Sequence, residues 1–262
     1  SVSKQKISYN DAISQTEELI KDSIKLRLRS DVPLGTFLSG GIDSSLVTAI
    51  ASQESGNPLN TFSIGLDDKR FDESKYAYQV ARKYGTTHHH TYLDHKCLDS
   101  LPEVVWMFSD LYGDSSAMPA YLVSKQASEE LKVVFTGDGA DEIFGGYPIP
   151  YAVYLSEFYK RTPKAIREKL GTLGSKIDIK KLPRQMRWLL RFNELSLMNF
   201  DQLNSSFCLN NAWGSETDES KITSDQSSKT LTHRILLSEI DDRMINDYLV
   251  KVDMSTMAHS IE

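Results

Sequence analysis

The sequence has few cysteines and lacks a long apolar run. Its two cysteines, Cys97 and Cys208, stand far apart and form no C-x-x-C pair, so neither a disulfide framework nor a structural zinc site is expected. No apolar run approaches the roughly 20 residues that cross a bilayer, and the polar start has no apolar signal-peptide core. We therefore expect a cytoplasmic protein with ordinary thiols and no membrane contact.

An excess of positive charge is also missing. The 30 Lys and Arg residues against 36 Asp and Glu give a formal net charge of -6, whereas binding to a nucleic-acid backbone needs a net basic surface. This argues against nucleic acid as the main partner and leaves open only a local basic patch. The helical run with Arg184, Arg187 and Arg191 is one place for it, but we interpret these arginines first as one face of an amphipathic helix.

Strand and helix patterns alternate in the first half of the chain. Apolar residues at helical spacing predict a long helix over 10–29, which Pro33 ends. A short apolar strand over 34–38, a glycine turn and a helix over 44–53 follow. Similar patterns predict strands at 59–65, 86–93 and 133–135, and helices from about 72 and over 98–109 and 115–130. This order predicts an α/β fold in which helices sandwich a parallel sheet, with ligands at the carboxyl ends of its strands.

Strand patterns fade after Tyr147. Helical patterns cover 151–170, 184–198 and 228–250, and the stretch 204–229 is so rich in Ser, Thr, Asn, Asp and Glu that it predicts a surface loop. With 262 residues, 40% of them hydrophobic, the chain can bury a substantial core. We expect one domain, with an α/β part over 1–150 and a mostly helical part over 151–262.

The segment 37–45, FLSGGIDSS, lies where the first strand passes into a helix. Glycines let the backbone approach an anion, the free amides of a helix start donate to phosphate oxygens, and hydroxyls add further donors. Asp43 would repel a phosphate unless a divalent cation bridges the two, so the segment predicts Mg²⁺ as well. The alternative is a capped helix after a glycine turn. The residues that this hypothesis places around the phosphates are Ser39, Gly40, Gly41, Asp43, Ser44 and Ser45.

A second group of acidic residues follows the strand at 133–135. Asp138, Asp141 and Glu142 stand within five residues of one another among glycines, an arrangement that is costly unless cations neutralise it. A metal site is the first interpretation. A solvated acidic loop is the second.

The motifs that the chain lacks and those that it carries together indicate a family. The chain has no G-x-x-x-x-G-K-[ST] and no G-x-G-x-x-G sequence, so neither a Walker-type NTPase nor a dinucleotide fold is supported. SGGIDSS resembles the pyrophosphate loop of the N-type ATP pyrophosphatases. Four further blocks, at 59–65, 72–90, 135–147 and 249–262, are similar to the C-terminal synthetase domain of glutamine-hydrolysing asparagine synthetases.

The resemblance implies a fold like that of the adenine nucleotide α hydrolases and a set of site residues. It implies that Asp43 and Asp141 bind Mg²⁺ on the pyrophosphate of ATP, and that Asp138 lies beside the substrate and the intermediate as a catalytic residue together with Asp141. Many relatives carry Glu at this position and β-lactam synthetases carry Tyr, so Asp138 favours amide formation over ring closure. Adenine would contact Leu38, Ile64, Thr136 and Gly137.

The resemblance also implies a reaction. Adenylylation of the aspartate side chain by ATP, followed by attack of ammonia, would give asparagine, AMP and pyrophosphate. The family's glutaminase domain begins with a cysteine, and this chain, which starts at Ser1, shows no counterpart. We expect that domain in the full-length protein, and this chain by itself would require free ammonia. The family pattern continues beyond Glu262 to a catalytic lysine, so we expect a truncated chain in which nothing identifies Lys251 as its substitute. A homodimer stays open.

Three other functions stay open at this level. A relative could amidate another carboxylate, such as a peptide or sugar acid, or the chain could bind nucleotide without turnover. A tRNA-thiolating enzyme ranks last, because neither cysteine flanks the 39–45 loop.

Two short segments have competing explanations. The run 88–90 consists of three histidines, but alternate residues of a strand point to opposite faces, which disfavours a zinc site. The segment 110–116 precedes a helix and either borders a substrate pocket or forms a plain helix cap.

Overall fold

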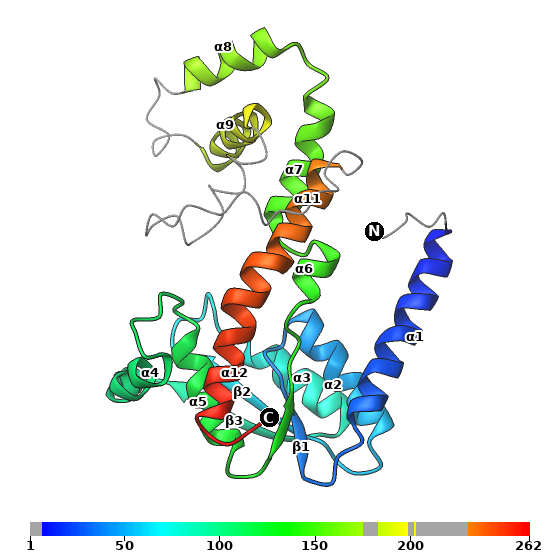
Figure 1. The fold of residues 1–262 in the computed structure, drawn as a ribbon, viewed down its shortest axis with the longest axis vertical. Helices are drawn as coiled ribbons and strands as arrows, with labels where there is room; N and C mark the ends of the chain where they lie inside the picture. The colour runs from blue at the N-terminus through cyan, green and yellow to red at the C-terminus, as the bar shows by residue number, and fades with distance from the viewer. Residues whose placement is uncertain (1–6, 175–182, 199–201, 203–229) are drawn as a thin grey trace. The chain divides into compact units, whose positions relative to one another are not determined.

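The structure is a computed structural model that describes residues 7–174, 183–198, 202 and 230–262. The chain divides into two compact units, one formed by residues 1–138 and 248–262, the other by residues 139–247. We call them the first and the second unit (Figure 1). The expected surface loop at 204–229 and Cys208 lie outside the described residues.

The first unit contains a four-stranded parallel sheet in the order β3-β2-β1-β4. Its strands are β1 (Leu34–Phe37), β2 (Asn60–Leu66), β3 (Thr87–Leu93) and β4 (Val133–Phe135). Its helices are α1 (Tyr9–Arg27), α2 (Ile42–Glu54), α3 (Ser74–Tyr84), the 3₁₀ helix η1 (His95–Ser100), α4 (Leu101–Phe108), α5 (Ala117–Ala127) and α12 (Leu249–Met257). The predicted α/β class is therefore confirmed.

The first helix illustrates how the sequence sets an element's bounds. The side chain of Ser8 accepts a hydrogen bond from the amide of Asp11 (3.1 Å) and caps α1. Ile24 is buried against Ile50 and Leu59, on the side of the sheet that α1 and α2 cover. The helix ends at Arg27 with Leu28 as its C-cap residue, two residues before the predicted end, and Pro33 follows before β1. A cap and apolar residues at helical spacing thus account for this helix.

The two faces of the sheet differ in chemistry. The face toward α2 and α3 carries hydroxyl groups, and Thr36 of β1 hydrogen-bonds Thr48 of α2 through their hydroxyls (2.8 Å). The opposite face is apolar: Phe62 of β2 packs with Ala127, Leu131 and Ile261, the last of which follows α12. Because side chains alternate along a strand, Thr36 and Phe62 fall on opposite faces of the sheet, and the face of Thr36 also carries the apolar Leu34 and Phe135 toward α2.

The backbone of Glu262 lies along the outer edge of β4. The amide of Glu262 donates to the carbonyl of Lys132 (2.9 Å), and the amide of Val134 donates to the carbonyl of Glu262 (2.9 Å). This is the hydrogen-bond pattern of a parallel strand pair. Residues about 130 positions apart in the sequence therefore pair at this edge of the sheet.

The second unit is helical where the structure describes it, as the sequence predicts. It consists of α6 (Ala140–Phe144), α7 (Pro148–Tyr159), α8 (Lys164–Gly174), α9 (Arg184–Leu197), α11 (Leu231–Ser238) and the π-helix η5 (Glu239–Tyr248). Val153, Leu195 and Ile235 form its apolar core. The buried Arg167 donates through Nη1 to the carbonyl of Ser196 (2.7 Å), which joins α8 to α9.

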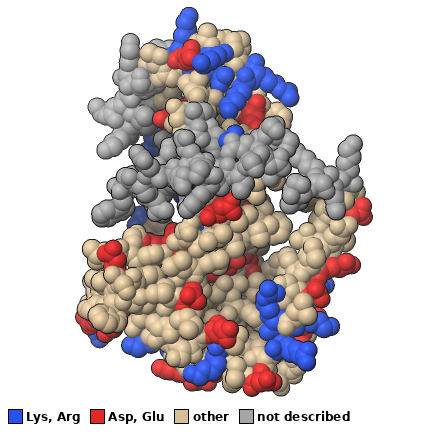
Figure 2. Space-filling model, viewed as in Figure 1, with Lys and Arg blue, Asp and Glu red and all other residues tan. Residues whose placement is uncertain are grey.

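Two surface properties bear on the expectations from composition. On the face drawn in Figure 2, basic and acidic side chains are interspersed over the first unit.

None of the helices in the described part of the chain combines the length and the apolar character needed to cross a membrane.

Candidate active site

The segment after β1 forms a loop that hydrogen bonds close on itself. The amide of Ser39 donates to Ser44 Oγ (3.2 Å), and the two serine hydroxyls hydrogen-bond each other (2.9 Å). The amide of Gly41 donates to Ser39 Oγ (3.2 Å). Gly41 is the N-cap residue of α2 and, having no side chain, makes no side-chain cap to the first amides of this helix. We call residues 38–45 the phosphate loop, after the interpretation that the sequence suggested.

Gly40 allows the phosphate loop to lie against the start of α3. Its φ angle is +95°, a conformation that side chains rarely adopt. A β-carbon at this position would come within 2.8 Å of the amide nitrogen of Ala77 and of the carbonyl oxygen of Glu73. The loop backbone is therefore fixed by close backbone contact, which only glycine permits.

The first turn of α2 presents groups that suit an anion. The first amides of a helix have no partner within it, and the positive end of its dipole lies at the same place. Asp43 is in this turn and is partly exposed, so its carboxylate stands beside these amides. Anion-binding amides next to an accessible carboxylate are what a phosphate carrying a divalent cation needs. The residues present fit both groups.

The segment after β4 packs onto the same turn. A β-carbon on Gly137 would lie 2.7 Å from the amide nitrogen of Ser44 and 3.0 Å from the carbonyl carbon of Asp43. Thr136 and Gly137 are partly buried and Asp138 is exposed. The structure thus brings the end of β4 and the phosphate loop together, although about a hundred residues separate them in the sequence.

The residues expected to hold adenine differ in accessibility. Leu38 is 0% exposed; it is enclosed by Ala77 and Ala81, and its amide donates to the carbonyl of Phe62 (2.8 Å). Ile64, near the carboxyl end of β2, is partly exposed. Leu38 therefore presents no free surface in this structure, and its contact with adenine stays a prediction.

Asp141 and Glu142 belong to the second unit and lie on the short helix α6, between Gly139 (φ +95°) and Gly145 (φ +70°). The amide of Gly146 donates to the carbonyl of Asp141 (3.0 Å), and a β-carbon on Gly146 would collide with Asp141 Oδ1. Asp43 belongs to the first unit. The sharing of one Mg²⁺ by Asp43 and Asp141 therefore stays a prediction.

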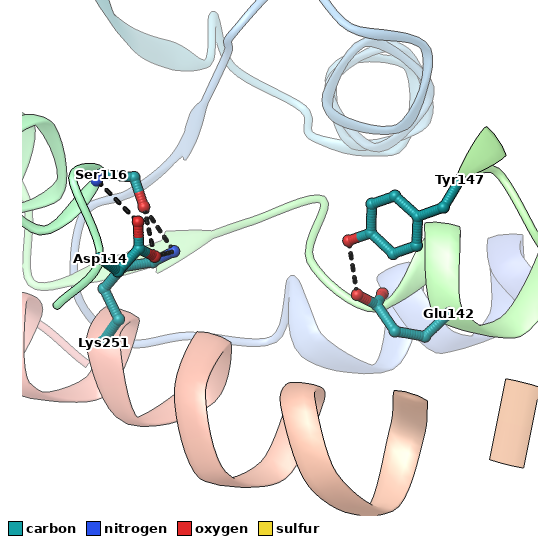
Figure 3. A network of polar contacts seen from close by, with 5 residues as sticks. All are labelled: Asp114, Ser116, Glu142, Tyr147 and Lys251. Atoms are coloured by element: carbon teal, nitrogen blue, oxygen red, sulfur yellow. Dashed lines mark hydrogen bonds and ion pairs between the residues drawn. The ribbon is translucent and has the colours of Figure 1, made fainter. Parts of the chain in front are cut away.

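Glu142 is an internal residue of the second unit. It is only 1% exposed, and its Oε1 accepts a hydrogen bond from the hydroxyl of Tyr147 (2.7 Å; Figure 3). The sequence suggested three carboxylates around a cation, whereas the structure gives this one a tyrosine partner. In the described part of the chain, no group of three or more His, Cys, Asp or Glu side chains gathers as a metal site would require.

The three histidines of β3 alternate between the faces of the sheet, as predicted. His88 hydrogen-bonds the hydroxyls of Thr61 (2.9 Å) and Ser63 (3.1 Å), and His90 hydrogen-bonds Ser63 (2.7 Å) on the same face. His89 lies on the other face and stacks on Phe62. Burial, with some repulsion from the other two histidines, lowers the pKa of His88 to about 4. These side chains join β2 to β3.

A partly buried ion pair in the first unit was not predicted from the sequence. The Lys251 ammonium donates to Asp114 Oδ2 and to Ser116 Oγ, both at 2.7 Å (Figure 3). Asp114 Oδ1 also accepts the amide of Ser116 (2.8 Å) ahead of α5. Burial would raise the pKa of Asp114, but the hydrogen bonds from Lys251 and Ser116 outweigh it and hold that pKa below its usual value. Because 137 positions separate Lys251 from Asp114, no local pattern could have revealed the pair.

Comparisons with known proteins agree with the resemblance of the motifs. A glutamine-hydrolysing asparagine synthetase of Bacillus subtilis is 31% identical over 261 residues, which cover 95% of this chain and 41% of that protein. A protein of Methanocaldococcus jannaschii that is described as an asparagine synthetase is 39% identical over 171 residues, which cover 64% of this chain and 32% of its own length. A maize asparagine synthetase is 38% identical over 164 residues, 57% of this chain and 28% of that protein.

The chain spans less than half the length of these relatives. The family model described as asparagine synthase matches residues 15–262. On this match over nearly its whole length, the chain belongs to the asparagine synthase family.

Proposed function

We propose that this chain is the ATP-dependent synthetase part of an asparagine synthetase. It would transfer AMP from ATP to the side-chain carboxylate of aspartate and then pass the acyl group to ammonia. Family membership supports the use of ATP. The observation that carries the proposal is the phosphate loop, which serine hydroxyls close and against which the backbone of Gly137 packs.

The first step is the activation of a poor electrophile. An oxygen of the aspartate carboxylate would attack the α-phosphorus of ATP, the bond to the β-phosphate oxygen would break, and pyrophosphate would leave. The amides at the start of α2 would stabilise the charge that develops on the leaving group. Ser39 and Ser44 would hold these amides in place through the hydrogen bonds described above.

Asp43 would hold Mg²⁺ in this site, with Asp141 as the second carboxylate. Bound Mg²⁺ neutralises phosphate charge and is commonly held by one or two carboxylates together with substrate phosphates. A partly exposed carboxylate beside free helix amides fits this role. Asp43 would otherwise repel the phosphates that the amides attract.

In the second step, the nitrogen of ammonia would attack the acyl carbon, and the bond between that carbon and the AMP oxygen would break. The products are asparagine and AMP, and the nitrogen gives up one proton. Asp138 is exposed at the end of β4 and would lie beside the reacting carboxylate. The relatives' names describe glutamine hydrolysis, so a glutaminase domain is the expected ammonia source in the longer protein, and free ammonia would replace it here.

The test measures AMP formation and ATP binding in two variants, each of which replaces one serine of α2. We expect ATP, Mg²⁺, aspartate and ammonium to yield AMP, and Ser44→Ala to lose most of this activity and ATP affinity because the loop loses its closing hydroxyl. Ser52→Ala is the matched control, since the Ser52 hydroxyl is buried without a hydrogen-bond partner in the described part of the chain.

A panel of other carboxylates, including peptide and sugar acids, completes the experiment. If AMP forms with another acid and not with aspartate, that acid replaces aspartate as the proposed substrate. ATP binding without AMP would reduce the proposal to nucleotide binding. Absence of ATP binding would reject the phosphate loop itself.

A further inference from the structure

The ion pair between Lys251 and Asp114 is nearly enclosed by protein. The side chain of Lys251 is 11% exposed and that of Asp114 is 19% exposed. The Lys251 ammonium also lies 4.7 Å from the ring centre of Tyr248. Carboxylate, hydroxyl and aromatic ring thus surround one ammonium group, and breaking such a pair leaves an uncompensated buried charge.

Chain connections within the first unit place this pair at the carboxyl edge of the sheet. The chain leaves α5, passes Lys132 and enters β4, so the end of α5 lies at the amino edge. α12 runs beside α5 from Lys251, which binds Asp114, down to Glu262, which binds Lys132. Asp114 precedes the other end of α5, roughly 16 Å away for a helix of this length. This is the edge at which β1 gives way to the phosphate loop.

The pair lies on the side of that edge opposite α2. α5 packs against β2 and β3, and Ala127 near its end contacts Phe62 on the apolar face. The phosphate loop leads into α2, on the hydroxyl-bearing face. A nucleotide held by the start of α2 would therefore leave the α5 side of the edge for a second substrate, and the segment 109–116 borders that side.

We propose that Lys251 and Asp114 are positioning residues that clamp the segment 109–116 as one wall of the carboxylate-substrate site. The inference rests on the proposed function and deepens it. Lys251 does not react in this arrangement, because its ammonium is already engaged by Asp114 and Ser116. The clamp sets the affinity for the acceptor carboxylate and leaves the nucleotide site unchanged.

The test compares the Michaelis constants for the two substrates. In Lys251→Met, we expect the KM for aspartate to rise on the order of tenfold or more, as a small displacement of a positioning wall would cause. The KM for ATP should stay within about twofold, because no contact of the phosphate loop is lost. Lys251→Arg keeps the charge and should restore most of the aspartate affinity. Asp114→Asn removes the charge of the other partner in the ion pair and should raise the KM for aspartate as Lys251→Met does.

Lys132→Met is the matched control, since Lys132 is an exposed lysine between α5 and β4. ATP binding and near-ultraviolet circular dichroism report whether each variant is folded. Should Lys251→Met fail to fold, Lys251→Arg and Asp114→Asn decide the question by the same two constants.

The outcomes separate the two claims. A wild-type chain that makes AMP, with variants in which both constants rise together or neither changes, overturns the clamp and leaves the proposed function intact. A wild-type chain that makes no AMP with any carboxylate overturns the proposed function, and the clamp with it.

Discussion

Replacing Gly137 by alanine tests the contact that joins the end of β4 to the phosphate loop. The new β-carbon would lie 2.7 Å from the amide nitrogen of Ser44, whereas ordinary contact begins at 3.4 Å. The obstructing atoms belong to the backbone of the first turn of α2, which cannot rotate away as a side chain can. The two segments must therefore separate by about 0.7 Å.

The size of the effect follows from this displacement. Overpacking of this kind costs about 1–3 kcal/mol in the free energy of unfolding, which lowers the melting temperature of a chain of this size by roughly 2–12 °C. The amide of Ser44 is among the proposed phosphate donors, and a hydrogen bond to a charged group is worth about 1.5–3 kcal/mol. Misplacing it should raise the Kd for ATP on the order of tenfold.

The assay combines thermal unfolding with calorimetric titration of ATP in the presence of Mg²⁺. Gly56→Ala serves as the control, because a β-carbon on Gly56 meets no atom within 4 Å. We expect that control to keep its melting temperature and ATP affinity. An unchanged melting temperature and Kd in Gly137→Ala would refute the close packing described here, and a lower melting temperature with unchanged ATP affinity would refute the phosphate role of this turn.

Three further predictions follow from single residues. Asp43→Asn removes the charge that repels phosphate, so ATP affinity in this variant should depend less on Mg²⁺ than in the wild type. The ratio of ATP affinity with Mg²⁺ to that with EDTA measures this dependence, and the same ratio in the wild type and the variant would contradict the prediction. Tyr147→Phe leaves the buried Glu142 carboxylate without its hydroxyl donor and should lower unfolding free energy by about 1–3 kcal/mol; Glu142→Gln, which keeps an acceptor, should cost less in the same denaturation experiment. Burial lowers the pKa of His88 to about 4, so between pH 6.5 and 4 the unfolded chain binds a proton that the folded chain does not. The free energy of unfolding should therefore decrease as pH falls from about 6.5 toward 4, and His88→Gln should flatten that slope. An NMR titration in which the His88 imidazole of the folded protein titrates near 6.5 would disprove this prediction.

Local patterns predicted much of the fold. The Ser8 cap bonds a residue three positions away, and the apolar residues of α1 recur at helical spacing, so the helix could be predicted without knowledge of its partners. The turn at Gly40 and Gly41 likewise predicted a strand passing into a helix. These features arise from backbone preferences that do not depend on the rest of the molecule.

Contacts between distant segments could not be predicted in the same way. A lysine and an aspartate separated by 137 positions carry no pattern that marks them as a pair. Glu142 resembled a metal ligand because it follows two other acids, and only its burial against Tyr147 shows a different role. Periodicity indicates which face of an element is apolar, but the partner of that face is set by tertiary packing.

The pairing of Glu262 with β4 affects the order in which the protein can form during synthesis. Residues 1–138 are made before residues 248–262, which belong to the same compact unit. At about 5–20 residues per second, the intervening stretch of roughly 110 residues delays them by roughly 5–20 seconds. Throughout that interval the outer edge of β4 offers unpaired amides and carbonyls to any neighbouring strand. On the ribosome, this edge of β4 is therefore open to pairing with other strands until residues 248–262 have been made.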